Sequence, residues 1–383
     1  MEYTPQNNPI PNPAADSPQP LPQSAAPTAA QTPPPPPNFA PPSPEEQRAQ
    51  ARRSLRRSAN LGGLMLILLI VLSNALSYLG LWLLNSFGQG LDGGLRTTLV
   101  QLISYASMYL IAIPVLLAIF NRGSGHRMKD LFVRPQNPPA DGKFLLKWTV
   151  IGFGCTYAVN YVFNLFFQLL RAFGVELNAP SMVSEPGWLN GIITFVAFAI
   201  AAPLCEELFF RGSLLGRLRG HGEWFAILMV GILFGMTHMN YQQIFYAAAL
   251  GIIAGFVCVK SRSILPAILL HFSLNLVGAI QSLLIGTIDL NELTSSTPNF
   301  HYLAEHILPL LGVLLLSLLC LGMAVTGVVF LCLELAKRRQ NFRLQNGCPL
   351  LTGGEKAVAF LTSPGIFLFL LMAVVMTALN AAG

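Results

Sequence analysis

Two adjacent glutamates, Glu206 and Glu207, lie in an apolar stretch that runs from Ile200 to Phe210 and is followed by Arg211. A carboxylate at bilayer depth costs about 2.5–3.5 kcal/mol on insertion scales, so we expect a chain that carries two of them to use them. On a helix, Glu207 and Arg211 are four residues apart and share a face, which allows an ion pair. Glu206 points about 100° away from Glu207. The spacing therefore predicts a structural carboxylate on Glu207 and a chemically available one on Glu206.

Two further polar motifs follow the glutamates in apolar segments. Phe234 and His238 form the first, and His271 and Asn275 form the second. His271 and Asn275 are four residues apart and project from the same helix face. Each motif alone has a structural interpretation, such as an interhelical hydrogen bond or a polar residue that packs helices. Three polar groups on nearby apolar segments favour a shared functional site.

The composition predicts an integral membrane protein. The chain has 383 residues, of which 53% are hydrophobic and 10% charged, and its mean hydropathy is +0.56. The net charge of +6 comes from basic residues in short loops between apolar segments, which is the positive-inside pattern, so nucleic-acid binding is not expected. Six cysteines show no paired spacing, so no disulfide framework or cysteine-based zinc site is predicted.

Nine apolar segments are each long enough to cross about 30 Å of hydrocarbon, which predicts an all-α, polytopic membrane helix bundle. The expected spans are residues 61–84, 98–120, 144–170, 187–209, 224–240, 242–259, 263–286, 304–334 and 357–381. The fifth and sixth are short and nearly abut, so eight spans are the alternative. In this arrangement Glu206 lies near the cytoplasmic end of the fourth span and His238 toward the outer end of the fifth. The two can meet only if the fourth helix is tilted and runs on past Arg211, or if the fifth begins later.

The chain divides into four predicted regions. Residues 1–47 are a disordered Pro-, Ala- and Gln-rich cytoplasmic tail without the apolar core of a signal peptide. Residues 48–186 hold spans one to three, residues 187–286 a catalytic core of spans four to seven, and residues 287–383 spans eight and nine. Five arginines before the first span predict a cytoplasmic N-terminus: Arg48, Arg52, Arg53, Arg56 and Arg57. The tail composition is typical of a bacterial protein, so we expect a bacterial plasma membrane.

The ordered motifs resemble those of the CPBP family (CAAX protease and bacteriocin-processing, or Abi), which consists of intramembrane glutamic endopeptidases. The family pattern is Glu-Glu-x-x-x-Arg, then Phe-x-x-x-His, then His-x-x-x-Asn. This sequence meets it, in that order, with Glu206, Glu207 and Arg211, with Phe234 and His238, and with His271 and Asn275. The resemblance covers residues 187–286 and implies a membrane endopeptidase without a cofactor.

The resemblance also implies roles for the residues. Glu206 would be the general base that activates a water for attack on a peptide carbonyl. His238 would hold or polarise that water, and His271 and Asn275 would donate hydrogen bonds to the developing oxyanion, at about 2.7–4 kcal/mol per donor. Three side chains would provide structural support: Glu207, Arg211 and Phe234.

Other functions use the same residues. Two carboxylates and two imidazoles could hold a zinc ion with an open position for water, although the H-E-x-x-H motif of many zinc proteases is absent. A non-enzymatic bacteriocin-immunity or scaffolding protein, or a transporter that relays protons, could also keep a buried polar cluster. An enzyme would take a peptide or membrane-protein substrate in the bilayer; the sequence does not decide which substrate, or the oligomeric state.

Overall fold

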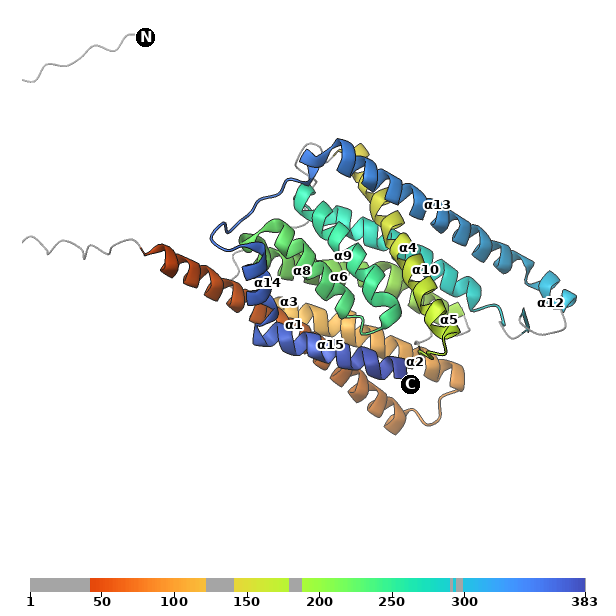
Figure 1. The fold of residues 1–383 in the computed structure, drawn as a ribbon. Helices are drawn as coiled ribbons and strands as arrows, with labels where there is room; N and C mark the ends of the chain where they lie inside the picture. Colours follow the sequence, from red (N-terminus) through yellow and green to blue (C-terminus); the bar gives the residue numbers. More distant parts are fainter. Residues whose placement is uncertain (1–41, 122–140, 179–187, 290–291, 294–298, 383) are drawn as a thin grey trace, which may run out of the picture. The chain divides into compact units, whose positions relative to one another are not determined.

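The computed structural model describes residues 42–121, 141–178, 188–289, 292–293 and 299–382. Most of the predicted tail lies outside this part. The chain separates into residues 1–43 and a unit of residues 44–383, and the fold described here is that of the second unit. All regular elements in the described ranges are helical, which confirms the all-α class (Figure 1).

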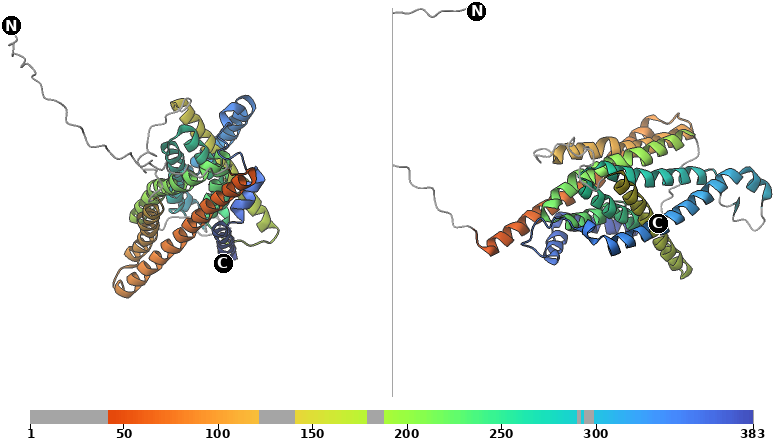
Figure 2. Two further views of the ribbon diagram at one scale, coloured as in Figure 1. Left: turned by 90° about the vertical axis from the view of Figure 1, so that its left-hand side faces the viewer. Right: turned by 90° about the horizontal axis from the view of Figure 1, so that it is seen from above.

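Within the described ranges, eight helices are long and apolar enough to cross a membrane, as expected of a polytopic bundle. They are Pro44–Phe87, Gly93–Phe120, Gly142–Ala172, Leu189–His221, Tyr241–Ser261, Leu265–Ile285, Ile307–Lys337 and Pro364–Ala382. Within the bundle α1 (Pro44–Phe87) packs along α15 (Pro364–Ala382), and α13 (Ile307–Lys337) packs on α4 (Gly142–Ala172) (Figures 1 and 2). The short α12 (Phe300–Glu305) precedes α13.

The fifth predicted span is a shorter apolar helix, α8 (Glu223–Met236), which ends four residues before its predicted end. Its first amide donates to the carbonyl of Gln345. In the turn after it, the carbonyl of Met239 accepts from Asn380, near the C-terminal end of α15. Although α8 is short, its start and the turn after it are therefore hydrogen-bonded to two different parts of the chain. It packs closely along α9 (Tyr241–Ser261), where a Cβ on Gly231 would lie 2.8 Å from a backbone nitrogen of the neighbouring helix.

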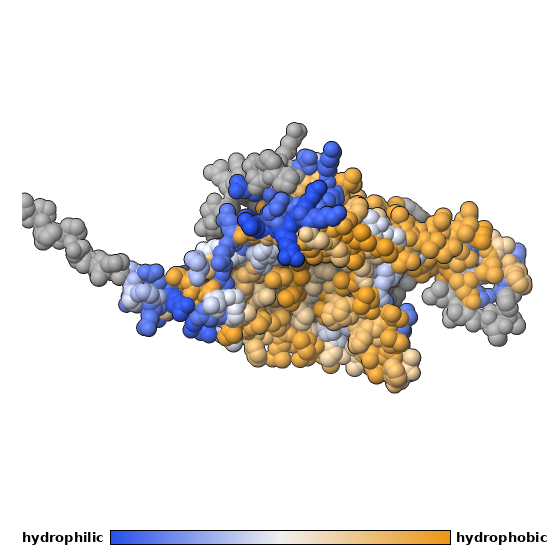
Figure 3. Space-filling model, turned by 45° about the horizontal axis from the view of Figure 1, so that its top comes forward, coloured by the Kyte–Doolittle hydropathy of each residue, from blue (hydrophilic) through white to orange (hydrophobic). Residues whose placement is uncertain are grey.

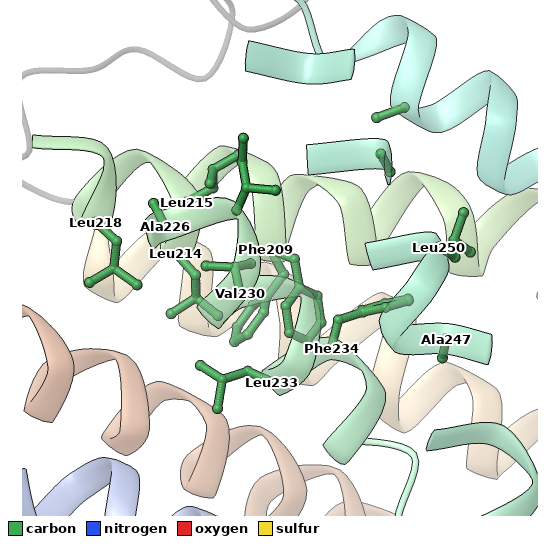
Figure 4. Packing of buried hydrophobic residues seen from close by; sticks show 14 of the residues in the cluster. Phe209, Leu214, Leu215, Leu218, Ala226, Val230, Leu233, Phe234, Ala247 and Leu250 are labelled. Atoms are coloured by element: carbon green, nitrogen blue, oxygen red, sulfur yellow. The ribbon is translucent and has the colours of Figure 1, made fainter. Parts of the chain in front are cut away.

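The fourth predicted span does not end at residue 209 but continues to His221. It consists of α5 (Trp188–Phe195), η3 (Val196–Ala201), α6 (Ala202–Glu207), η4 (Leu208–Leu215), α7 (Gly216–Leu218) and η5 (Arg219–His221), of which η3 and η4 are π-helical. The extension persists because Leu214, Leu215 and Leu218 are buried in the core beside α8 (Figure 4).

This continuation corrects the predicted depth of Glu206. The residue lies 17 positions after Leu189 and 15 before His221. At about 1.5 Å per residue it is roughly 25 Å from one end and 22 Å from the other, midway along the helix. The expected conflict with the position of His238 therefore disappears.

The arginines before the first span belong to helix α1 itself and bind the C-terminal part of the chain. Arg48 donates to the carbonyl of Leu350, Arg52 pairs with Glu355, and Arg56 donates to Thr362. These contacts hold the start of α1 against α14 (Gly353–Leu361) and the turn before α15. The predicted ninth span is therefore two helices, because Pro364 begins a new one. Hydrophilic residues gather at this end, whereas most of the visible surface elsewhere is hydrophobic (Figure 3).

Candidate active site

Glu206 lies in α6, and its side chain is almost fully buried. The hydroxyl of Tyr109 donates to its Oε1 at 3.1 Å. Its other oxygen, Oε2, lies 3.9 Å from Nε2 of His271. One oxygen of the carboxylate is thus held by a hydrogen bond, and the other faces an imidazole across a distance too long for a direct hydrogen bond.

Glu207 forms the buried ion pair that the sequence predicts. Its Oε1 lies 2.9 Å from Nη1 of Arg211, and both side chains are fully buried. Arg211 also donates from Nη2 to the carbonyl of Gly251 at 3.2 Å, and its guanidinium lies 4.8 Å from the centre of the Phe234 ring. The bond to α9 and the ring of α8 fix the guanidinium, so Glu207 is locked in place.

His271 lies between the two glutamates on α10 (Leu265–Ile285). Its Nδ1 is 2.9 Å from Oε1 of Glu207, and its Nε2 faces Glu206. A carboxylate accepts only, so we assign the proton on Nδ1 to this bond. The neutral ring then presents Nε2 to Glu206 as an acceptor, and only the protonated ring can donate from it. Glu207 therefore sets both the orientation and the tautomer of His271.

Both histidine rings pack against Phe234. The His238 and His271 rings stand edge to face against its ring, with centroids at 5.2 and 5.6 Å. His238 lies in the turn after α8 rather than inside a span, because the helix ends at Met236. Its Nδ1 is 2.9 Å from the carbonyl of Phe234. The proton belongs on Nδ1 here as well, since a carbonyl only accepts, and Nε2 is the nitrogen that can meet a water or a substrate.

Asn275 is one turn beyond His271 on α10, as the spacing predicts, and is partly exposed. Its Nδ2 donates to the carbonyl of Phe198 at 2.8 Å. An amide nitrogen has two hydrogens, so this bond occupies one and orients the other. Phe198 belongs to the π-helical segment η3.

Sequence reasoning missed Tyr109 and the carbonyls of Phe198 and Gly251. Tyr109 lies in the π-helical segment η1 (Ala106–Ala112), between α2 (Gly93–Tyr105) and α3 (Ile113–Phe120). A tyrosine hydroxyl in an apolar span is a visible feature of the sequence, but Tyr109 belongs to none of the three motifs. The carbonyls left no signal, because every residue carries one. Three π-helical segments hold parts of the site (η1, η3 and η4), and such segments often occur at functional sites.

The zinc alternative needs three or more carboxylates, imidazoles or thiolates that converge on one point. Among the residues that the structure describes, no group of three or more His, Cys, Asp or Glu side chains is arranged to hold a metal ion. Glu207 Oε1 is shared between Arg211 and His271, and both histidines use Nδ1 for other bonds. These bonds leave Nε2 of both histidines as the ring nitrogens that can still accept.

Fold and site together define a polytopic helical membrane protein with a buried cluster of two glutamates and a histidine. The glutamates lie midway along one helix, and His271 reaches them from α10. Residues 188–277 match the family model described as "Type II CAAX prenyl endopeptidase Rce1-like". This match confirms, for residues 188–277, the resemblance to the CPBP family that the motifs indicated, and all seven motif residues lie inside it.

One curated relative is an "Uncharacterized 24.3 kDa protein" of Escherichia coli. It is 32% identical over 95 residues, which cover 23% of this chain and 44% of that protein. The chain thus spans less than half the length of the curated relative that it matches. No solved structure matches the chain.

Proposed function

We propose that this protein is a membrane endopeptidase that hydrolyses a peptide bond of a peptide or membrane-protein substrate with a water activated by Glu206. The observation that carries the proposal is the 3.9 Å separation between Oε2 of Glu206 and Nε2 of His271, in a buried cluster midway along the helix. A polar pair at that distance suits a water that bonds to both atoms. Such a water would be held by a general base and an oriented imidazole.

In the proposed reaction Glu206 takes a proton from the water while the water oxygen bonds to the substrate carbonyl carbon. The carbonyl oxygen becomes an oxyanion in a tetrahedral intermediate. The carbon–nitrogen bond then breaks, and the proton held by Glu206 passes to the leaving amine. Water is consumed, an acid and an amine are formed, and the carboxylate is restored.

The oxyanion needs donors, and the geometry favours a division of roles different from the one that the resemblance implied. His271 faces the base, so we assign it to the water. The second Nδ2 hydrogen of Asn275 is the donor that remains available to a carbonyl oxygen, while Nε2 of His238 faces either the water or the leaving group. Removal of one oxyanion donor costs about 2.7–4 kcal/mol in known enzymes.

Glu207 and Arg211 act through His271. Their ion pair carries no net charge, and Oε1 of Glu207 accepts from Nδ1 of His271. The pair also excludes other orientations of His271, since its Oε1 is held by the guanidinium. We therefore expect Glu207→Gln to slow the reaction without abolishing it.

The test is cleavage of a peptide library by the purified protein in liposomes, with products identified by mass spectrometry. We expect the wild-type protein to cleave and Glu206→Gln to lose activity while it still inserts and accumulates. Glu334→Gln is the matched control, because Glu334 is also a buried carboxylate, paired with Lys147 at 2.7 Å on other helices. Equal activity of wild type and Glu206→Gln would refute the proposal.

Two further arms separate the alternatives. A chelator should leave the rate unchanged, and loss of activity that added zinc restores would favour a zinc protease. A bacteriocin-immunity or scaffolding protein predicts no cleavage by the wild type and an unchanged cellular phenotype in Glu206→Gln.

We also propose that the end of the bundle at which α1 begins faces the cytoplasm of a bacterial cell. Arg48 binds the carbonyl of Leu350, and Lys260 binds that of Arg343, so basic residues from three parts of the chain lie near one another. Excess positive charge marks the cytoplasmic side. Reporter fusions after residue 289 and at the C-terminus should report the opposite side.

A further inference from the structure

Tyr109 is a buried tyrosine outside the Rce1-like segment, 97 residues before Glu206 in the chain. Its hydroxyl donates to Oε1 of Glu206 at 3.1 Å. Its backbone carbonyl lies 3.4 Å from Sγ of Cys205, the residue before Glu206. Two contacts from one residue therefore join η1 to the point on α6 that carries the general base.

The hydrogen bond distinguishes the two carboxylate oxygens of Glu206. A rotation that turns the carboxylate plane away from Tyr109 would break this bond in a buried place where replacement by bulk water is costly. With Oε1 held, Oε2 is the oxygen that faces Nε2 of His271. The tyrosine thus fixes the plane of the carboxylate, so that one oxygen is presented to a water beside His271.

We infer that Tyr109 is a positioning residue for the proposed hydrolysis: it holds Oε1 of Glu206 so that Oε2 acts as the base. This inference rests on the proposed function. It also means that the active site is completed by a helix from the N-terminal half of the chain, so the segment that matches the family does not contain the whole site. Tyr109 acts through Glu206 and has no role in substrate binding.

The kinetic test compares Tyr109→Phe with Tyr105→Phe in liposomes, on whichever library peptide the wild type cleaves. Tyr105 is the matched control, since it lies one turn earlier and its hydroxyl bonds Thr194 rather than Glu206. We expect Tyr109→Phe to lower kcat about 10- to 100-fold with KM unchanged, the size expected for loss of one hydrogen bond to a charged group. Tyr105→Phe should retain the wild-type kcat.

Several outcomes would overturn the inference. A wild-type kcat in Tyr109→Phe excludes a positioning role, and a raised KM at unchanged kcat means that Tyr109 contacts the substrate instead. Each of these two results for Tyr109→Phe refutes the role of Tyr109. The proposed function stays intact as long as the wild type cleaves and Glu206→Gln does not. Absence of cleavage by the wild type would overturn both.

A stability measurement covers the case in which Tyr109→Phe folds poorly. Unfolding of Tyr109→Phe, Glu206→Leu and the double variant forms a thermodynamic cycle. We expect the double variant to lose less stability than the two single changes together, because each single change leaves a buried polar group without its partner. Additive losses would show that the hydrogen bond does not exist, and the inference would fail.

Discussion

Replacement of Arg211 by methionine should destabilise the protein strongly, because it leaves a charged carboxylate buried without its partner. Both side chains of the Arg211–Glu207 pair are fully buried, and the charged atoms are 2.9 Å apart. Removal of one member of such a pair costs about 3–5 kcal/mol. The substitution also removes the bond to the Gly251 carbonyl and the contact with the Phe234 ring, so we expect a loss at the upper end of that range.

The double variant Arg211→Met/Glu207→Gln tests whether the uncompensated charge causes the loss. Without the carboxylate charge there is no buried ion to stabilise, and replacement of a whole buried pair is often close to neutral. The amide oxygen can still accept from Nδ1 of His271. We therefore expect the double variant to be more stable than Arg211→Met alone.

The assay is unfolding by sodium dodecyl sulfate in mixed micelles, followed by the fluorescence of the four tryptophans. Arg52→Met is the control, because Arg52 also pairs with a carboxylate, that of Glu355, but the two side chains are 50% and 30% exposed. Its loss should cost only about 1 kcal/mol. The reasoning fails if Arg211→Met costs no more than Arg52→Met, or if the double variant loses as much stability as Arg211→Met and Glu207→Gln together.

Three further predictions concern other parts of the molecule. Asn275→Ala should lower kcat of peptide cleavage about 100- to 1000-fold, the loss expected for one oxyanion donor, and an unchanged kcat would remove that role. Gly231→Ala should cost about 1–3 kcal/mol in unfolding, because its Cβ would enter the backbone of α9, whereas Gly278→Ala, with nothing within 4 Å, should be neutral or slightly stabilising. Hydrogen bonds from Thr352 hold the pKa of Glu355 below its ordinary value of 4.5, so this carboxylate stabilises α14 above about pH 4.5 and stops doing so as pH falls through the lowered pKa. Protection of the α14 amides against hydrogen exchange, taken relative to their intrinsic exchange rate at each pH, should fall over that range in the wild type and not in Glu355→Gln.

The sequence by itself determined the membrane class, the resemblance of one segment to the CPBP family and the pairs that are close along the chain. A hydrophobic run of about 20 residues must be helical in a bilayer, because no other segment satisfies its own backbone hydrogen bonds there. Within a helix, a spacing of four residues places side chains on one face, so the Glu207–Arg211 pair and the shared face of His271 and Asn275 could be predicted. These conclusions need only local geometry.

The tertiary structure alone decided what surrounds Glu206. Tyr109 comes from a helix far away in the chain. It lies in a π-helical segment that no sequence pattern predicted. His271 lies between both glutamates because helices α6 and α10 pack together, and hydropathy carries no information on which helices are neighbours. The depth of the site also depended on the extension of its helix to His221, which follows from burial of leucines against α8 rather than from span length. Contacts between segments far apart in the chain depend on packing, and packing is a property of the whole fold.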